Sequence, residues 1–334
     1  MTSEKNVKLN LLKGFACMGV VFIHVLFPGT FGQVVQAASS YAVPIFFMIA
    51  GYYAFGKNDA VIRRRALKIG KIFLSAYALF FVFCIWRRDA TAFLAENFNW
   101  KTPIMYIVFC TIDFAIPLWY LIAMLEIYAV WYSVVRKGRE KSLVKLFPAL
   151  FVLRAALTIY CSARGLDWFW HVNFLAQGMP WFLLGYYLHT DRSEKCRNLP
   201  YWILVLMTAG GTLISILPAI LHWKTNLSAV GSVSCALGLF LLTLKDPGKS
   251  ICRPIEYIGE RLSLPIYILH VLIDVKFCYY LEAYLKIDTG TTVFAWFRPI
   301  IIFTVTVLAA WIVSVCTQCV RSAWNKIRRE RNGV

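Results

Sequence analysis

Long apolar runs separated by short polar turns dominate the chain from residue 9 to residue 319. Apolar residues are nearly continuous within these runs, which is typical of helices surrounded by lipid or by other helices. The pattern predicts an all-α integral membrane protein with about ten transmembrane helices. We expect these helices at residues 9–27, 40–56, 72–86, 116–135, 146–161, 172–189, 201–221, 227–244, 264–281 and 299–319.

The apolar run at 102–135 is too long for a single transmembrane helix. Asp113 and Pro117 interrupt it, and the residue before a proline is disfavoured in a helix. We therefore expect a short helix or re-entrant piece at 104–114 on the outer side, followed by the transmembrane helix at 116–135.

The turns between the runs alternate between basic and nearly neutral. The turns predicted on one side, together with both termini, hold 25 Lys and Arg residues, the turns on the other side hold 7, and three more lie within runs. Because cytoplasmic loops carry an excess of Lys and Arg, this asymmetry predicts that both termini are cytoplasmic. The basic end of the chain, 320–334, is expected to stop transfer and to contact membrane lipids.

Composition supports this class. The 334 residues are 60% hydrophobic and 16% charged, whereas a soluble domain is about one quarter charged. The net charge of +18 is confined to the turns, so membrane lipids explain it and we expect no nucleic-acid partner. Most of the ten cysteines lie in apolar runs without metal-ligand spacing, so we expect neither a metal site nor a disulfide set. Residues 1–334 are expected to form a single membrane domain.

The first apolar run contains two ionisable residues, Lys13 and His24, which are eleven positions apart. On a helix this spacing places them on one face within about 20° and about 16 Å apart along the axis. Ionisable groups inside a membrane usually face a protein interior or a wet cavity. The simplest alternative is that Lys13 reaches the lipid headgroups and His24 bonds a neighbouring carbonyl group.

Four further patterns follow in order. They are an aromatic segment opening at Tyr41 with Pro44 and Gly51, a basic cluster at 63–71, the segment Pro117-Leu-Trp-Tyr-Leu with the later Gly178-Met-Pro-Trp-Phe, and Ser263-Leu-Pro-Ile-Tyr-Ile-Leu-His270. Together with Lys13 and His24 they resemble the acyltransferase 3 family of bacterial membrane O- and N-acyltransferases over nearly the whole chain.

The chain departs from the family pattern at three positions. Lys13 stands where the family usually has Arg, so a bidentate phosphate contact is replaced by a point charge. The cytoplasmic Arg-x-x-Arg of the family corresponds to Arg65-x-x-Lys68, and Ala50 replaces a Ser that often precedes Gly51.

The resemblance implies an enzyme of the bacterial inner membrane. Such an enzyme would transfer an acyl group, typically acetyl from acetyl-CoA in the cytoplasm, to a hydroxyl or amine of an envelope glycan or lipid-linked sugar. CoA is polyanionic, so its phosphates require cations on the cytoplasmic side. We expect these contacts from Lys13, Arg63, Arg64, Arg65, Lys68 and Lys71, with Trp119 and Tyr120 lining the path of the acyl group.

His24 is the expected general base, with an acyl-imidazole intermediate as the alternative. It needs an orienting acidic partner, for which Asp113, Glu126 and Asp274 are the candidates. His270 and Asp274 are four residues apart and either form a second polar site or belong to the helix core. The candidate catalytic residues are therefore His24, Asp113 and His270.

Two other classes of function remain open. A secondary transporter of a small polar solute is one, and the membrane part of VanT-type serine racemases, which is associated with serine uptake, also resembles this chain. Transporters commonly have repeated halves, and no repeat is visible here. A structural envelope protein is the other class, and the ionisable residues within apolar runs argue against it.

Overall fold

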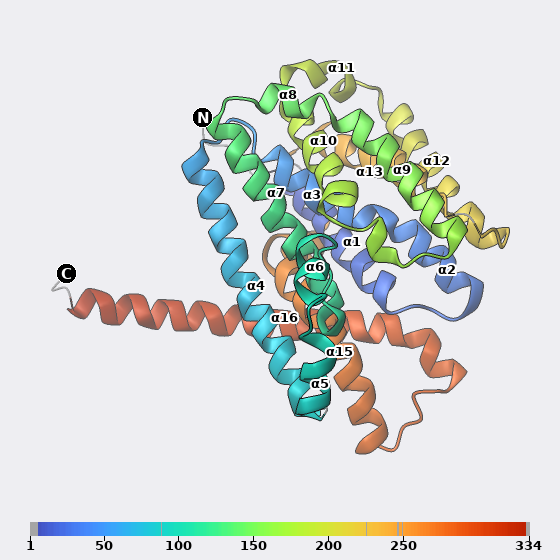
Figure 1. The fold of residues 1–334 in the computed structure, drawn as a ribbon, viewed down its shortest axis with the longest axis vertical. Coiled ribbons are helices and arrows are strands. Elements are labelled where there is room, and N and C mark those ends of the chain that lie inside the picture. Colours follow the sequence, from blue (N-terminus) through green and yellow to red (C-terminus); the bar gives the residue numbers. More distant parts are fainter. Residues whose placement is uncertain (1–5, 88, 225, 246, 249, 332–334) are drawn as a thin grey trace.

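The computed structural model describes residues 6–331 apart from 88, 225, 246 and 249, and every regular element in this part is helical (Figure 1). The α-helices are α1 Val7–His24, α2 Gly29–Ala38, α3 Ala42–Tyr52, α4 Asp59–Arg87, α5 Ala90–Asn97, α6 Thr102–Ile107, α7 Trp119–Arg136, α8 Glu140–Val144, α9 Phe147–Arg164, α10 Met179–His189, α11 Glu194–Arg197, α12 Tyr201–Ile220, α13 Ser228–Lys245, α14 Arg253–Tyr257, α15 Ser263–Ala283 and α16 Thr292–Arg331. Short 3₁₀ segments are η1 Ser39–Tyr41, η2 Asp113–Leu118, η3 Trp168–Trp170 and η5 Asp191–Ser193, and π-helical turns are η4 Phe174–Gly178 and η6 Ile258–Leu262.

Nine helical segments in the described part of the chain are long and apolar enough to cross a membrane. They are Val7–His24, Gly29–Tyr52, Asp59–Trp86, Asp113–Arg136, Phe147–Arg164, Tyr201–Ile220, Ser228–Lys245, Arg253–Ala283 and Thr292–Val320. The all-helical class is confirmed, and nine such segments replace the ten that the sequence predicts.

The sixth predicted segment, 172–189, is the one missing from these nine, and it is helical only in η4 and α10. Asn173 caps its start, because its side-chain oxygen accepts bonds from the N–H groups of Leu175 and Ala176. The helix is therefore at most about 24 Å long, less than the hydrocarbon thickness of about 30 Å. Most of α10 is buried, so neighbouring helices rather than lipid surround it.

Two predicted boundaries change in a way that affects the site. The second segment begins at Gly29 rather than at residue 40, as α2, η1 and α3 follow one another closely. The basic cluster at 63–71, predicted as a loop, lies within the first turns of α4, which begins at Asp59. A helix fixes the direction of each basic side chain, which a loop would not.

The predicted short helix before the fourth long segment is present as α6, which ends at Ile107, and Asp113 begins η2. The side of the membrane on which it lies stays a prediction.

The long helices form a buried centre and an exposed periphery. The share of buried residues in an apolar 18-residue stretch differs among these segments. It is 50% in α1, 61% in Asp113–Arg136 and 50% in α13, but only 11% in α4. Figure 1 shows α4 along one flank, α9 and α12 along the opposite side, and α16 running crosswise. The exposed leucine, valine and isoleucine side chains of α4 and α16 provide a surface suited to lipid.

Close packing against the turn before α15 fixes the position of α1. A Cβ atom added to Gly14 would lie 2.2 Å from the carbonyl oxygen of Ile255, and one added to Gly259 would lie 1.9 Å from that of Asn10. Only glycine permits such backbone approach. Lys13 and His24 therefore have a defined position relative to α14, η6 and α15.

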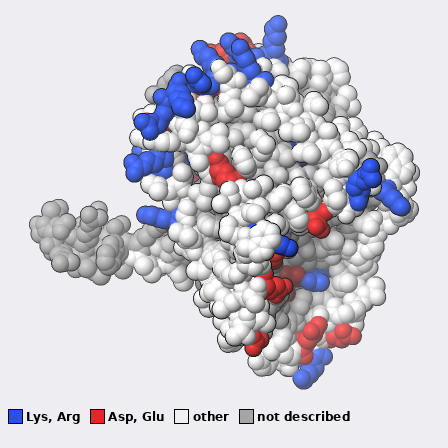
Figure 2. All heavy atoms as spheres, viewed as in Figure 1, with Lys and Arg blue, Asp and Glu red and all other residues white. Residues whose placement is uncertain are grey.

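Lys and Arg side chains gather at the end of the molecule where α8, α11 and the start of α4 lie (Figure 2). These elements carry three of the turns predicted to be cytoplasmic. The predicted basic end 320–334 continues α16 as far as Arg331, and residues 332–334 and most side chains of this end lie outside the described part.

The predicted orientation can be tested by cysteine labelling from outside intact cells. Ala92→Cys in α5 is expected to react with a membrane-impermeant maleimide, and Lys141→Cys in α8 is expected to react only after permeabilisation, because both side chains are exposed but at predicted opposite sides. The background must lack the native cysteines, since Cys316 and Cys319 are exposed. Labelling of position 141 but not 92 in intact cells would reverse the topology.

Candidate active site

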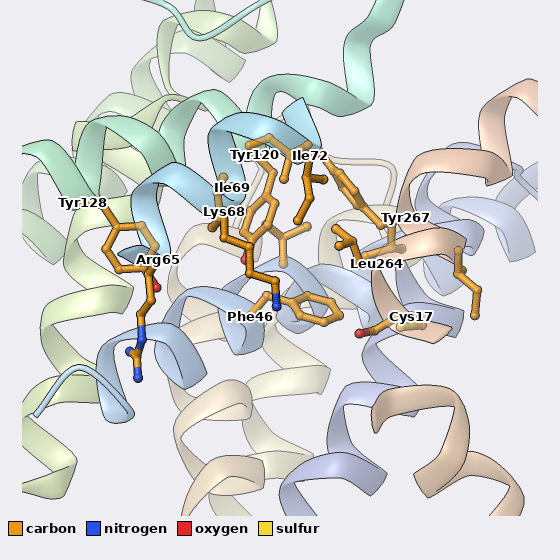
Figure 3. Close-up of a pocket in the computed structure, with 15 residues that line it drawn as sticks. Cys17, Phe46, Arg65, Lys68, Ile69, Ile72, Tyr120, Tyr128, Leu264 and Tyr267 are labelled. Carbon is orange, nitrogen blue, oxygen red and sulfur yellow. The ribbon is translucent and has the colours of Figure 1, made fainter. Parts of the chain in front are cut away.

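A cavity of about 310 Å³ lies between α1, α3, α4, α7 and the start of α15; we call it the first cavity (Figure 3). Figure 3 shows Lys68 reaching from α4 toward Phe46, Arg65 below Tyr128 with its guanidinium turned away from the other lining residues, and Leu264 and Tyr267 on the opposite wall. The remaining lining residues are Cys17, Val20, Val43, Phe46, Ile69, Ile72, Tyr120, Leu121, Tyr128, Ser263 and Ile266. The cavity is thus apolar over most of its wall and cationic on the α4 side.

Helical spacing explains which basic residues reach this cavity. Arg65, Lys68, Ile69 and Ile72 are spaced as residues i, i+3, i+4 and i+7, so they share one face of α4. The other cations predicted to bind CoA, Arg63, Arg64 and Lys71, are exposed and do not line the cavity.

The opening helix lies along the same cavity. Cys17 and Val20 line it, and they lie on the face of α1 that carries Lys13 at one end and His24 at the other. Lys13 is partly buried and is not among the lining residues. The predicted common face of Lys13 and His24 is therefore the face turned toward the cavity.

His24 faces His270, and the centroids of the two imidazole rings are 5.0 Å apart. His270 is fully buried, and its Nδ1 lies 3.1 Å and 2.8 Å from the carbonyl oxygens of Ile266 and Tyr267. A carbonyl oxygen can only accept, so Nδ1 carries the proton and Nε2 presents a lone pair. That buried Nε2 has no hydrogen-bond partner among the described residues. His270 is thus arranged to accept a hydrogen bond through Nε2.

Two tyrosines connect the first cavity to this histidine pair. The ring of Tyr120 lies 5.4 Å from that of Tyr267, which in turn lies 6.3 Å from the ring of His270. Both tyrosines line the cavity, and the buried hydroxyl of Tyr267 has no bonding partner in the part of the chain that the structure describes. Tyr267 therefore belongs to the cavity wall and is also a neighbour of His270.

None of the three acidic candidates contacts the histidine pair in the described structure. Asp274 instead binds Arg298 through two hydrogen bonds of 2.9 and 2.6 Å. Glu126 accepts a bond of 3.2 Å from the thiol of Cys110. Asp113 is exposed at the start of η2.

The sequence leaves two alternatives open for His270 and Asp274, a second polar site or the helix core. His270 agrees with the second, since it is fully buried and lies within bonding distance of carbonyl groups of its own helix. His270 contacts His24, and Asp274 joins α15 to α16. Sequence reasoning gave no separate role to Tyr267, although its position three residues before His270 places it one helical turn away.

The predicted lining residues of the acyl path, Trp119 and Tyr120, contribute to two different cavities. Tyr120 lines the first, whereas Trp119 lines a second, larger cavity of about 750 Å³. Val43 lines both. The ring of Phe47 lies 4.7 Å from that of Tyr120 and 6.1 Å from that of Trp119. Side chains of α3 and α7 therefore form a thin partition between the two cavities.

On α1 the two cavities also meet near His24. Val20 lines the first cavity and Ile23, the residue before His24, lines the second. Neither histidine is among the lining residues of either cavity, but His24 lies next to a lining residue of the second cavity and one helical turn from a lining residue of the first.

Comparison with known proteins gives one result. A family model described as an acyltransferase domain, that of acyltransferase 3, matches residues 6–315. Neither a curated protein nor a solved structure matches the chain. Since the match covers essentially the whole chain, this multi-pass membrane protein belongs to the acyltransferase 3 family.

Proposed function

We propose that this protein transfers an acetyl group from acetyl-CoA in the cytoplasm to a hydroxyl or amine of an envelope glycan or lipid-linked sugar at the bacterial inner membrane. The observation that carries this proposal is the first cavity. It has cations at one wall, an apolar interior, and a histidine pair beyond its far wall.

The cavity suits the donor. A volume of about 310 Å³ can hold the acyl group and part of the pantetheine arm but not the nucleotide, which would remain outside. Arg65 and Lys68 would then contact phosphate oxygens where the arm enters, through charge-assisted hydrogen bonds. Arg64 and Lys71, exposed on the same helix, and Lys13 on α1 would add positive potential around the entrance.

The histidine pair suits the chemistry. In the proposed reaction His24 removes the proton of the acceptor hydroxyl or amine, whose oxygen or nitrogen attacks the thioester carbonyl carbon. The carbon–sulfur bond then breaks, and the leaving CoA thiolate takes from His24 the proton that came from the acceptor. No hydrogen bond joins the two rings in the described structure, so the proposed reaction requires Nε2 of His270 to accept an N–H of His24 during the reaction, a role usually filled by a carboxylate.

The proposal is tested with purified protein in lipid vesicles. Acetyl-CoA labelled in the acetyl group is expected to transfer label to the glycan and lipid-linked sugar fraction of the source membranes, whereas vesicles without the protein should transfer none. A transporter would instead accumulate a labelled solute such as serine without using acetyl-CoA. Solute uptake without acetyl transfer would overturn the proposal.

A further inference from the structure

The second cavity differs from the first in its chemistry. Helices α2, α9, α12 and α13 and the segment around η4 contribute to it, at the end of the molecule away from α8 and α11 (Figure 1). Among the described residues, its charged lining side chains are Arg154 and Lys224, and no Asp or Glu lines it. The other polar lining residues are Gln33, Gln36, Ser40, Thr158, His171, Gln177, Ser215, His222, Asn226 and Ser228. The cavity is therefore polar and positively charged.

Arg154 is the most unusual of these residues, because its guanidinium is buried within the helix bundle with only 5% of the residue exposed. It donates to the side-chain oxygen of Gln177 at 2.6 Å, to the carbonyl oxygen of Ala229, and to the hydroxyl of Ser232 at 3.2 Å. These bonds use three of five N–H donors. No carboxylate pairs with Arg154 in the described part of the chain.

A buried cation without a counter-charge is costly. Removing one partner of a buried ion pair typically costs about 3–5 kcal/mol, because the remaining charge is uncompensated. Three neutral acceptors and the ring of Trp181, 5.3 Å from the guanidinium carbon, reduce this cost but supply no negative charge. An anion in the adjoining cavity would supply it and would use the two remaining donors.

His171 supplies a second group for such an anion. Its Nδ1 is buried without a hydrogen-bond partner among the described residues. Burial, together with the nearby positive charge of Arg154, lowers the pKa of His171. The ring is therefore neutral at pH 7 and can donate one N–H, while exposed Lys224 adds positive charge at the edge of the cavity.

We propose that the second cavity binds the acceptor substrate through an anionic group, a carboxylate or a phosphate, held by Arg154. The inference rests on the proposed function and narrows it, since it restricts the acceptors to acidic sugars and sugar phosphates. The anion would lie on one side of the partition formed by Val43 and Trp119, and the acceptor hydroxyl or amine would extend toward His24.

The alternative is a purely structural Arg154, which joins α9 to α13 and to η4. The two roles differ in what the protein binds. We would measure thermal unfolding of the purified full chain with glucuronate, with glucose 1-phosphate and with glucose, at equal ionic strength. Stabilisation by at least one of the two anions, but not by glucose, is expected. The anion that raises the unfolding temperature more shows whether the site prefers a carboxylate or a phosphate.

Three variants identify the site. Arg154→Gln is expected to raise the Kd of the effective anion at least tenfold, because a charge-assisted contact is lost. Lys224→Gln, on an exposed side chain that folding does not require, is expected to raise it severalfold. Arg164→Gln is the matched control, since Arg164 is an exposed cation at the end of the same helix and should leave the Kd unchanged.

Equal effects of glucose and both anions would overturn the inference, as would anion binding that survives in Arg154→Gln. If Arg154→Gln does not fold, the comparison of anions with glucose and the Lys224→Gln variant decide the matter. Acetyl transfer is measured on the same samples. Transfer without anion binding would refute this inference alone. Anion binding without transfer would refute the proposed function, and with it the acceptor role of the cavity, but would leave Arg154 as part of an anion-binding site.

Discussion

His24→Ala is expected to lower the rate of acetyl transfer by about 10²- to 10⁴-fold while acetyl-CoA still binds, because a general base is lost but the phosphate contacts remain. The assay is label transfer by purified, correctly inserted protein, with CoA binding measured separately. His270→Gln should give a smaller loss, since it removes the imidazole that packs beside His24 but not the base itself.

A matched control is available in His189, which packs on Phe55 at the end of α10, away from the first cavity. His189→Gln removes an imidazole without touching the proposed chemistry, so near-normal transfer is expected. Transfer at the wild-type rate in His24→Ala would show that His24 only packs, and the transporter interpretation would then be the better one.

Neutralising the cations of the first cavity has the second largest expected effect. The double variant Arg65→Gln with Lys68→Gln is expected to weaken acetyl-CoA binding at least tenfold, since one charge-assisted contact contributes roughly 1.5–3 kcal/mol. Binding to the purified protein can be measured at two salt concentrations, and the difference from wild type should shrink at high salt.

The control for this variant is Arg139→Gln with Lys141→Gln. These residues are exposed in the turn between α7 and α9, and the pair carries the same total charge on the same predicted side. If both double variants weaken binding equally, only the overall potential matters. If neither does, the cations of α4 serve solely to orient the protein in the membrane.

The sequence predicts the helical class well because each long apolar run must satisfy its own backbone groups within a helix. It fails at 172–189 because hydropathy alone cannot distinguish a helix surrounded by lipid from one surrounded by protein. The capping by Asn173 and the near-complete burial of α10 depend on contacts with other helices.

The candidate site is predicted in part for a related reason. Periodicity within one helix correctly places Lys13 and His24 on a common face. The same periodicity, applied to α4, would have shown that Arg65 and Lys68 lie on one face and that Arg63, Arg64 and Lys71 do not share it. The pairing of His24 with His270 joins residues 246 positions apart, so only tertiary packing brings them together. Likewise, the partner of Asp274 is on the following helix, which no local pattern shows.

The partition between the two cavities has an energetic consequence for a process that crosses a membrane. Moving one elementary charge through a potential of 100 mV changes its energy by about 2.3 kcal/mol, and CoA carries several negative charges. If the thioester is held on one side of Val43 and Trp119 and the acceptor on the other, the uncharged acetyl group passes one way and the acceptor proton, carried by His24, passes the other way, while the charges of CoA do not cross. The membrane potential would then act on that one proton, over the distance between the two sites, and not on the phosphates of CoA.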